Sequence, residues 1–300
     1  MKRARLLLAL LVCLAAPLAS LAQSIYVAAM RGQVAAGNVM SGLYSINLAN
    51  GAATFIAPLR TSDGRAVAIT GLGVEPTTRV FYGITSTLSP TSPQSLVTLD
   101  PHNGNVTVIG HLELAGTDMV FDHAGRLLIW LPDTRQAGVV DVKSGHVTRL
   151  GHAGPPDAFG GLAVDAEGQV YVTPSGAYGT LDRIQADGTI VQGPQLKGAP
   201  YPGAITAMTF TPSGLLLAIN SNVGSPAAAK LVTINTASGI IAEIGSLPED
   251  SDAITYAAPV HEIGDILATM SGRTLALFAL IAGLILAVTG MLVVTWIRRR

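Results

Sequence analysis

The feature that most constrains the fold of this chain is a hairpin pattern that recurs five times. Each copy has an apolar run, a polar turn that contains glycine, and a second apolar run. The copies are GLYSINLANGAATFIAPL (42–59), SLVTLDPHNGNVTVIGHL (95–112), GVVDVKSGHVTRLGHAG (138–154), GTLDRIQADGTIVQGPQL (179–196) and KLVTINTASGIIAEIGSL (230–247). Their turn glycines, 41 to 53 residues apart, are Gly51, Gly104, Gly145, Gly188 and Gly239. Because glycine accepts the positive φ of tight turns, the pattern predicts β-hairpins.

A second type of hairpin alternates with the first. Its copies start with small residues, and an acidic or Thr/Pro turn separates their two apolar strands; they are 69–85, 116–131, 159–174 and 205–220. Residues that form Asx-type turns stand in these turns, so we interpret them as turn formers rather than catalytic groups. They are Glu75, Asp122, Asp165 and Thr211.

One hairpin of each type gives four strands per repeat, which is the unit of a β-propeller. Pairing the hairpins gives four blades, at 69–112, 116–154, 159–196 and 205–247. The segments 24–30 and 251–259 remain, and together with 42–59 they predict a fifth blade built from both ends of the domain. We therefore expect an all-β fold, a five-bladed propeller. A sixth blade would need further strands, a β-sandwich or β-solenoid fits the period less well, and 31–41 and 86–94 could hold an irregular strand.

The first residues have the features of a secretory signal peptide. Lys2, Arg3 and Arg5 precede an apolar run, and Ser20-Leu21-Ala22 offers small residues at a cleavage site. We expect a signal peptide at 1–22 and an exported propeller at 23–258; the alternative is an N-terminal anchor that is retained. The chain's one cysteine lies within the expected signal peptide, so the mature protein would have no disulfide.

The last residues predict a membrane anchor. Residues 274–297 carry no charge, and a helix of this length can cross a hydrocarbon core of about 30 Å. The arginines at 298–300 outnumber Arg273 before the span, which places the C-terminus in the cytoplasm. We expect a stalk at 259–273, a single-pass transmembrane helix at 274–297, a cytoplasmic tail at 298–300, and a propeller outside the cell membrane, in the periplasm or at the cell surface.

Partners are only weakly indicated. Small residues four apart in the span, at Ala279, Gly283 and Ala287, would permit weak self-association, although alanine and glycine are also common in apolar spans. The formal net charge is −1, and charged residues make up 12% of the chain, so we expect no binding to nucleic acid.

The repeats resemble those of secreted bacterial propellers, namely the NHL, gluconolactonase-like and related families, including propellers of unknown function. The resemblance rests on L-x-x-I/L-D/N-x-x-x-G-x-x-x-x-I-G in the stretches that end at Gly110 and Gly245, and on G-L-A-x-D-x-x-G-x-x-Y at Gly161–Tyr171. In gluconolactonase-like members it implies a metal held by Glu, Asn and Asp from the inner strands. Of the expected inner-strand entries only Asp118 is charged, so the ligand set implied by the resemblance is incomplete.

Alignment of the expected inner strands gives a candidate ligand-binding site at the mouth of the central channel. It consists of Thr70, Thr117, Asp118, Thr206, Thr255 and Tyr256, with Gly160 in the remaining blade and Asp157 and Asp252 nearby. The alternative is that the threonines satisfy backbone groups at β-bulges.

No pattern of catalytic residues stands out. The histidines lack the spacing of a metal pair, and G-x-S-x-G, P-loop and H-E-x-x-H motifs are absent. We therefore expect no catalytic residue, cofactor or metal. The predicted function is a binding or scaffold module for an extracytoplasmic protein, glycan or small ligand; the alternative is a divergent metal-dependent hydrolase or lactonase with a site near Asp118.

Overall fold

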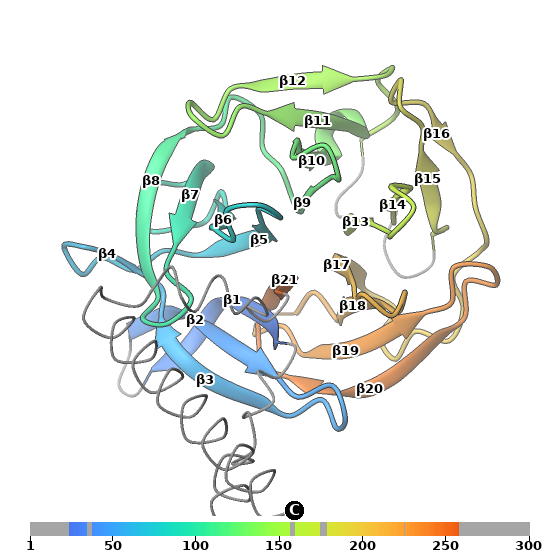
Figure 1. Ribbon diagram of the computed structural model, residues 1–300. Coiled ribbons are helices and arrows are strands. Elements are labelled where there is room, and N and C mark those ends of the chain that lie inside the picture. Colours follow the sequence, from blue (N-terminus) through green and yellow to red (C-terminus); the bar gives the residue numbers. More distant parts are fainter. Residues whose placement is uncertain (1–23, 35–37, 157–159, 175–178, 225, 258–300) are drawn as a thin grey trace, which may run out of the picture. The chain divides into compact units, whose positions relative to one another are not determined.

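The computed structural model describes residues 24–34, 38–156, 160–174, 179–224 and 226–257, and Ser24–Ala257 forms one compact unit. Five sheets surround a common centre (Figure 1). Their innermost strands contact one another in a closed circle, in the order β21 (Ser251–Ala257), β5 (Ile69–Val74), β9 (Met119–Phe121), β13 (Leu162–Val164), β17 (Ala204–Phe210) and again β21. This part of the chain is an all-β propeller with five blades, which confirms the fold expected from the repeats.

Four blades are continuous in sequence. The first blade continues from β5 with β6 (Phe81–Thr85), β7 (Ser95–Leu99) and β8 (Asn105–His111). The second continues from β9 with β10 (Leu127–Leu131), the 3-10 turn η1 (Pro132–Thr134), β11 (Gln136–Val140) and β12 (Val147–Leu150). The third continues from β13 with β14 (Val170–Val172), β15 (Asp182–Ile184) and β16 (Ile190–Val191). The fourth continues from β17 with β18 (Leu216–Ser221), β19 (Ala229–Ile234) and β20 (Ile241–Leu247).

The closing blade is made from both ends of the domain. Its strand order is β21, β1 (Ser24–Val34), β2 (Asn38–Ile46) and β3 (Ala53–Pro58). Strands β1 and β21 are antiparallel, and their register pairs Ile25 with Tyr256 and Ala28 with Ala253. The expectation that the two ends share one blade is confirmed. This pairing removes the two free sheet edges that an open ring would leave.

One strand was not expected from the repeats. The segment after β3 forms β4 (Arg60–Thr61), which pairs in parallel with Asn105 and Val106 at the outer edge of the first blade. A backbone hydrogen bond from Arg60 N–H to the carbonyl of Gly104, 3.1 Å long, supports the same contact. The chain leaving the closing blade is thus attached to the outside of the first blade.

The five glycines of the repeated turns join neighbouring blades. Gly104 has φ +72°, and a Cβ there would lie 2.3 Å from the carbonyl oxygen of Pro58 in the closing blade. A Cβ on Gly239 would come within 2.2 Å of the Gln195 carbonyl oxygen in the third blade. The other three make the same kind of contact, in the pairs Gly51–Gly245, Gly145–Gly110 and Gly188–Gly151. Each repeated turn therefore requires glycine, both for its backbone conformation and for its close contact with the preceding blade.

The residues interpreted as turn formers have that role. Oδ1 of Asp122 accepts hydrogen bonds from the backbone N–H groups of Ala124 and Arg126. Asp165 holds its turn in the same way, through Glu167 and Gln169. These bonds satisfy backbone donors within the turn, as Asx turns do.

The hydrophobic core consists of clusters between adjacent blades. Four of the five interfaces each hold ten or eleven buried apolar residues, among them Leu72 between the closing and first blades and Ile129 between the first and second. The cluster between the second and third blades has six buried residues, of which Trp130 is the largest. Among the described residues, this interface has the smallest apolar core.

The expected signal peptide, stalk, transmembrane helix and cytoplasmic tail lie outside the described residues. Within the described ranges no helix has the length and apolar character needed to span a membrane.

Candidate functional site

Three of the residues expected at the channel mouth, Thr70, Thr117 and Thr206, occupy irregular positions at the start of the inner strands. The pairing of β5 with β6 skips Thr70, and the pairing of β17 with β18 skips Thr206, so each is the extra residue of a β-bulge. In the second blade, Thr117 N–H donates to the backbone carbonyl of Trp130, whose own N–H donates to the backbone carbonyl of Asp118. In these three blades the irregularity therefore falls at corresponding residues of the inner strand.

The closing blade differs from the expected alignment. Its bulge falls at Asp252, because Ser251 pairs with Ala29 and Ala253 with Ala28. Thr255 lies three residues further along β21, opposite Tyr26. Asp252, which the sequence placed only as a neighbour, is therefore the structural counterpart of Thr70 and Thr206.

The third blade has Gly160 at the corresponding position, and the structure gives the reason. A Cβ at Gly160 would lie 2.4 Å from Nε1 of Trp130, so a threonine would collide with the buried indole. The five corresponding positions are Thr70, Thr117, Gly160, Thr206 and Asp252; we call them the bulge ring.

Hydrogen bonds link members of the bulge ring across the blades. The Thr70 hydroxyl donates to Oδ2 of Asp252 at 2.5 Å and lies 3.4 Å from the carbonyl oxygen of Thr117. The Thr117 hydroxyl donates to the carbonyl of Gly160 at 3.2 Å. The buried Thr206 hydroxyl lies close enough to Asp252 to lower its pKa, although it makes no hydrogen bond of normal geometry. The ring thus directs most of its polar groups to one another.

Asp118 lies beside the ring and joins three blades. Its Oδ1 accepts the N–H of Met119 at 2.8 Å, and its Oδ2 accepts those of Leu162 at 2.7 Å and Met208 at 3.1 Å. The residue has no exposed surface. Burial raises the pKa of Asp118 well above its ordinary value, while these three N–H groups act to lower it. Such a carboxyl has an architectural role, because both of its oxygens accept backbone hydrogen bonds and the residue has no exposed surface.

Asp252 has the second perturbed carboxyl at the centre. Burial raises the pKa of Asp252 to about 7, the hydrogen bond from Thr70 and the Thr206 hydroxyl lower it, and the charge of Asp250 raises it. Asp252 as a whole residue remains partly exposed, although its carboxyl is enclosed. Asp252 is therefore the ring member whose charge changes near neutral pH.

The remaining predicted site residues are separate from the ring. Thr255 is buried, and Tyr256 is partly buried with its backbone N–H donating to the Thr209 hydroxyl at 3.2 Å. Burial also raises the pKa of Tyr256. Asp157 lies outside the described residues. Within the described ranges, no three His, Cys, Asp or Glu side chains gather in a way that could hold a metal ion.

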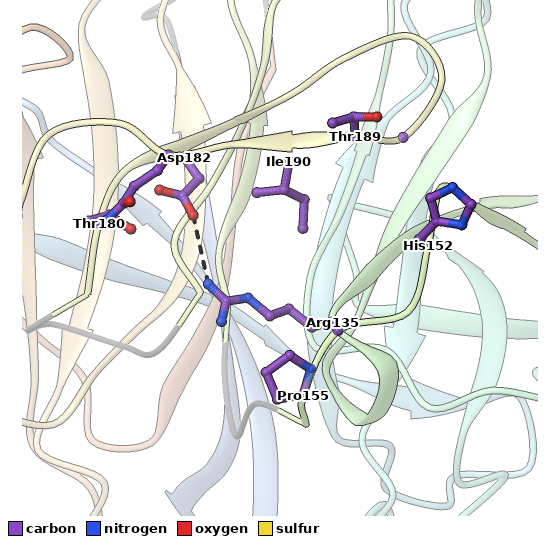
Figure 2. Close-up of a pocket in the computed structure, with 10 residues that line it drawn as sticks. Arg135, His152, Pro155, Thr180, Asp182, Thr189 and Ile190 are labelled. Carbon is purple, nitrogen blue, oxygen red and sulfur yellow. Dashed lines mark ion pairs between the residues drawn. The ribbon is translucent and has the colours of Figure 1, made fainter.

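A pocket that the sequence did not indicate lies between the second and third blades (Figure 2). Its volume is about 410 Å³, and its lining includes Arg135, His152, Pro155, Asp182 and Thr189. This volume falls in the usual range for small-molecule sites. Figure 2 shows Asp182 and Arg135 pointing toward each other, with Ile190 beside them.

The local backbone explains how Arg135 reaches the pocket. Pro132 starts η1, and Arg135 ends it with φ 48° and ψ 50°, the left-handed conformation. The N–H of Gly154 donates to the carbonyl of Thr134 at 2.8 Å, and a Cβ on Gly154 would lie 3.3 Å from the Arg135 side chain. The run Pro132-Asp133-Thr134 after a buried strand is the sequence signal for this turn, but nothing in it predicts the partner from the third blade.

Of the comparisons with known proteins, one with a solved structure supports the fold. No family model matches the chain, and no curated protein matches it. Among solved structures, a chain of the nidogen/laminin complex is similar, with a TM-score of 0.51 and 14% identity; the match covers 79% of this chain and 99% of that one. A structural genomics protein of unknown function from Bacteroides thetaiotaomicron VPI-5482 has a TM-score of 0.45 and 15% identity, over 65% of this chain and 53% of that one. The protein belongs to the structural class of five-bladed β-propellers.

Proposed function

We propose that this protein is a membrane-anchored, extracytoplasmic propeller that binds a partner or ligand. One observation carries the proposal: the central polar groups are used within the fold, whereas the pocket between the second and third blades offers an accessible space of about 410 Å³ lined by charged and hydroxyl side chains. Propellers present ligand-binding surfaces on a rigid scaffold. A solved chain of similar fold comes from a complex of two proteins, nidogen and laminin, which agrees with a binding role.

The proposed location follows from the two ends of the sequence. A signal peptide at 1–22 would export the propeller, and the span at 274–297 with its following arginines would hold it on the outer side of the cell membrane. Weak association between spans through Ala279, Gly283 and Ala287 would place two propellers side by side.

The alternative, a metal-dependent hydrolase or lactonase of the gluconolactonase-like type, has less support. It would need Asp118 to reach a metal or a substrate, but both carboxyl oxygens of Asp118 accept backbone hydrogen bonds. We therefore propose binding and not hydrolysis as the activity of the domain.

The location is tested with reporters fused to the full-length chain. A fluorescent protein after Arg300 should fluoresce, because it would remain in the cytoplasm, whereas alkaline phosphatase at the same place should be inactive. The reverse result, or release of the whole chain from membranes by alkaline carbonate, would contradict the proposed anchor and orientation.

The binding role is tested by photo-crosslinking in intact cells. A photoreactive residue replaces Gln192, an exposed residue at the pocket, and in a control variant it replaces Lys143, an exposed residue of an outer turn in the second blade. We expect a discrete adduct from position 192 and none, or a different one, from position 143. Identical adduct patterns, or none at either position, would contradict binding at this pocket.

A further inference from the structure

The interface between the second and third blades differs from the others in its packing. Counting only residues that the structure describes, its cluster has six buried apolar residues, where the other interfaces have ten or eleven. The third blade also has the shortest strands, since β13, β14 and β15 have three residues each and β16 has two. In the described part of the chain, two pockets, of about 410 and 170 Å³, lie along this interface.

Asp182 presents a buried carboxyl to the larger pocket. The residue is 2% exposed, and its Oδ1 accepts the N–H of Gly193 at 3.1 Å. Oδ2 of Asp182 lies 3.9 Å from Nη2 of Arg135. That separation is too long for a hydrogen bond, so Oδ2 retains acceptor capacity inside the pocket.

The opposite charges of this pair define the chemistry of a group that could contact both residues from the pocket. An anion would be attracted to Arg135 and repelled by the buried Asp182 carboxylate. A cation would be attracted to Asp182 and repelled by Arg135. A neutral hydroxyl satisfies both, because it donates one hydrogen bond and accepts another. It can donate to Oδ2 of Asp182 and accept from the Arg135 guanidinium, each bond being strengthened by the charge of its partner.

The rest of the lining suits a ligand with several hydroxyl groups. Thr180 and Thr189 line the pocket, and a threonine hydroxyl can either donate or accept. Ile190 and Pro155 add apolar surface against which carbon-bound hydrogens can pack. We propose that this pocket binds a neutral carbohydrate, with one sugar hydroxyl bridging Asp182 and Arg135. This inference rests on the proposed binding function and names its ligand class.

The test uses the full-length protein in micelles of a detergent without a sugar headgroup. The protein is applied to an array of neutral and acidic oligosaccharides, and the strongest neutral binder is then titrated against the wild type and three variants. Asp182→Asn keeps an acceptor for Gly193 and loses the charge. Arg135→Gln shortens and neutralises the other partner. Arg65→Ala is the matched control, because Arg65 pairs with Asp63 on an exposed turn.

We expect a neutral oligosaccharide to bind the wild type, with Kd raised at least ~10-fold by Asp182→Asn and by Arg135→Gln, and unchanged by Arg65→Ala. Thermal unfolding of each variant shows that it is folded. Unchanged affinity in both pocket variants would overturn the site, and binding of acidic sugars alone would overturn the ligand class. No sugar binding together with a crosslink from position 192 would overturn this inference and leave the proposed function standing. The absence of both would overturn both.

Discussion

The hydroxyl of Thr70 donates a hydrogen bond to Oδ2 of Asp252 over 2.5 Å, although the two residues are 182 positions apart in the chain. The bond joins the innermost strand of the first blade to the innermost strand of the closing blade. It forms only when the ring is closed, and it involves a carboxyl whose ionisation responds to pH near neutrality. Closure of the propeller and the charge of Asp252 are therefore coupled.

The first prediction concerns this coupling. Because burial raises the pKa of Asp252 from an ordinary value of 3.8 to about 7, the folded state binds its proton more tightly than the unfolded state. The resulting stabilisation is complete below pH 3.8 and is lost as the pH rises through 7. We expect the free energy of unfolding to fall by on the order of 2–3 kcal/mol, as an upper bound, from pH 5 to pH 8.

Asp252→Asn removes the titrating group while leaving an acceptor for Thr70. We expect the variant to lose this part of the pH dependence and to exceed the wild type in stability at pH 8. Denaturant unfolding of both proteins at pH 5 and pH 8 measures the difference. Equal pH slopes in the two proteins would contradict the assignment to Asp252.

The second prediction concerns Asp118. Asp118→Ala leaves the N–H groups of Met119, Leu162 and Met208 buried without acceptors. Each such group costs about 1–3 kcal/mol, so we expect a loss of at least ~3 kcal/mol in the free energy of unfolding. The control Asp63→Ala removes an exposed carboxyl and should change stability by less than ~0.5 kcal/mol. A similar small effect in both variants, measured by denaturant unfolding, would show that Asp118 does not hold the three blades together.

The third prediction concerns the turn glycines. Gly104→Ala imposes a strained backbone at φ +72° and places its Cβ against the Pro58 carbonyl, so we expect a loss of at least ~2 kcal/mol. Gly64→Ala at φ +83°, with no atom within 4 Å of its Cβ, carries the backbone cost alone, about 1 kcal/mol. The difference between their melting temperatures measures the blade contact. Equal melting temperatures would argue against that contact.

The fourth prediction tests the register of the closing blade. Ala28 and Ala253 are direct partners in β1 and β21, so cysteines at both positions should form a disulfide. The bond would close a loop of more than two hundred residues and stabilise the ring by up to ~5 kcal/mol. In the control, cysteines at positions 28 and 257 are separated by four residues of register, or ~13 Å, and should stay reduced. Thiol titration and non-reducing electrophoresis distinguish the outcomes.

Most of the architecture was predictable from the sequence because the repeats combine turn glycines with alternating apolar strands. The residual pieces at 24–30 and 251–259 have strand character and no partner elsewhere, which predicted the closing blade. The parallel strand β4 was missed because two residues, Arg60 and Thr61, have too little pattern to indicate a strand.

The candidate site was less predictable. The Ile-Thr pair at 254–255 resembles the pairs at 69–70 and 205–206, so Thr255 was aligned with Thr70 and Thr206, whereas the structure has Asp252, three residues earlier, at that position. Asp118 was singled out because it is the one charged residue among the expected inner-strand entries, but its partners Leu162 and Met208 are apolar residues that contribute only backbone N–H groups, which no sequence pattern indicates. The pocket at Arg135 and Asp182 was missed because it depends on contact between two blades, which no local pattern records.

The origin of β21 at the far end of the domain also sets the order of events during folding. Until residues 251–257 are available to form β21, β1 has no neighbour on its inner side, and the closing blade has a bare edge. The four continuous blades can form without β21, which must then pair with β1 to complete the ring. During biogenesis, that bare edge is the surface most exposed to mispairing, and a chaperone acting on this chain would have to shield it.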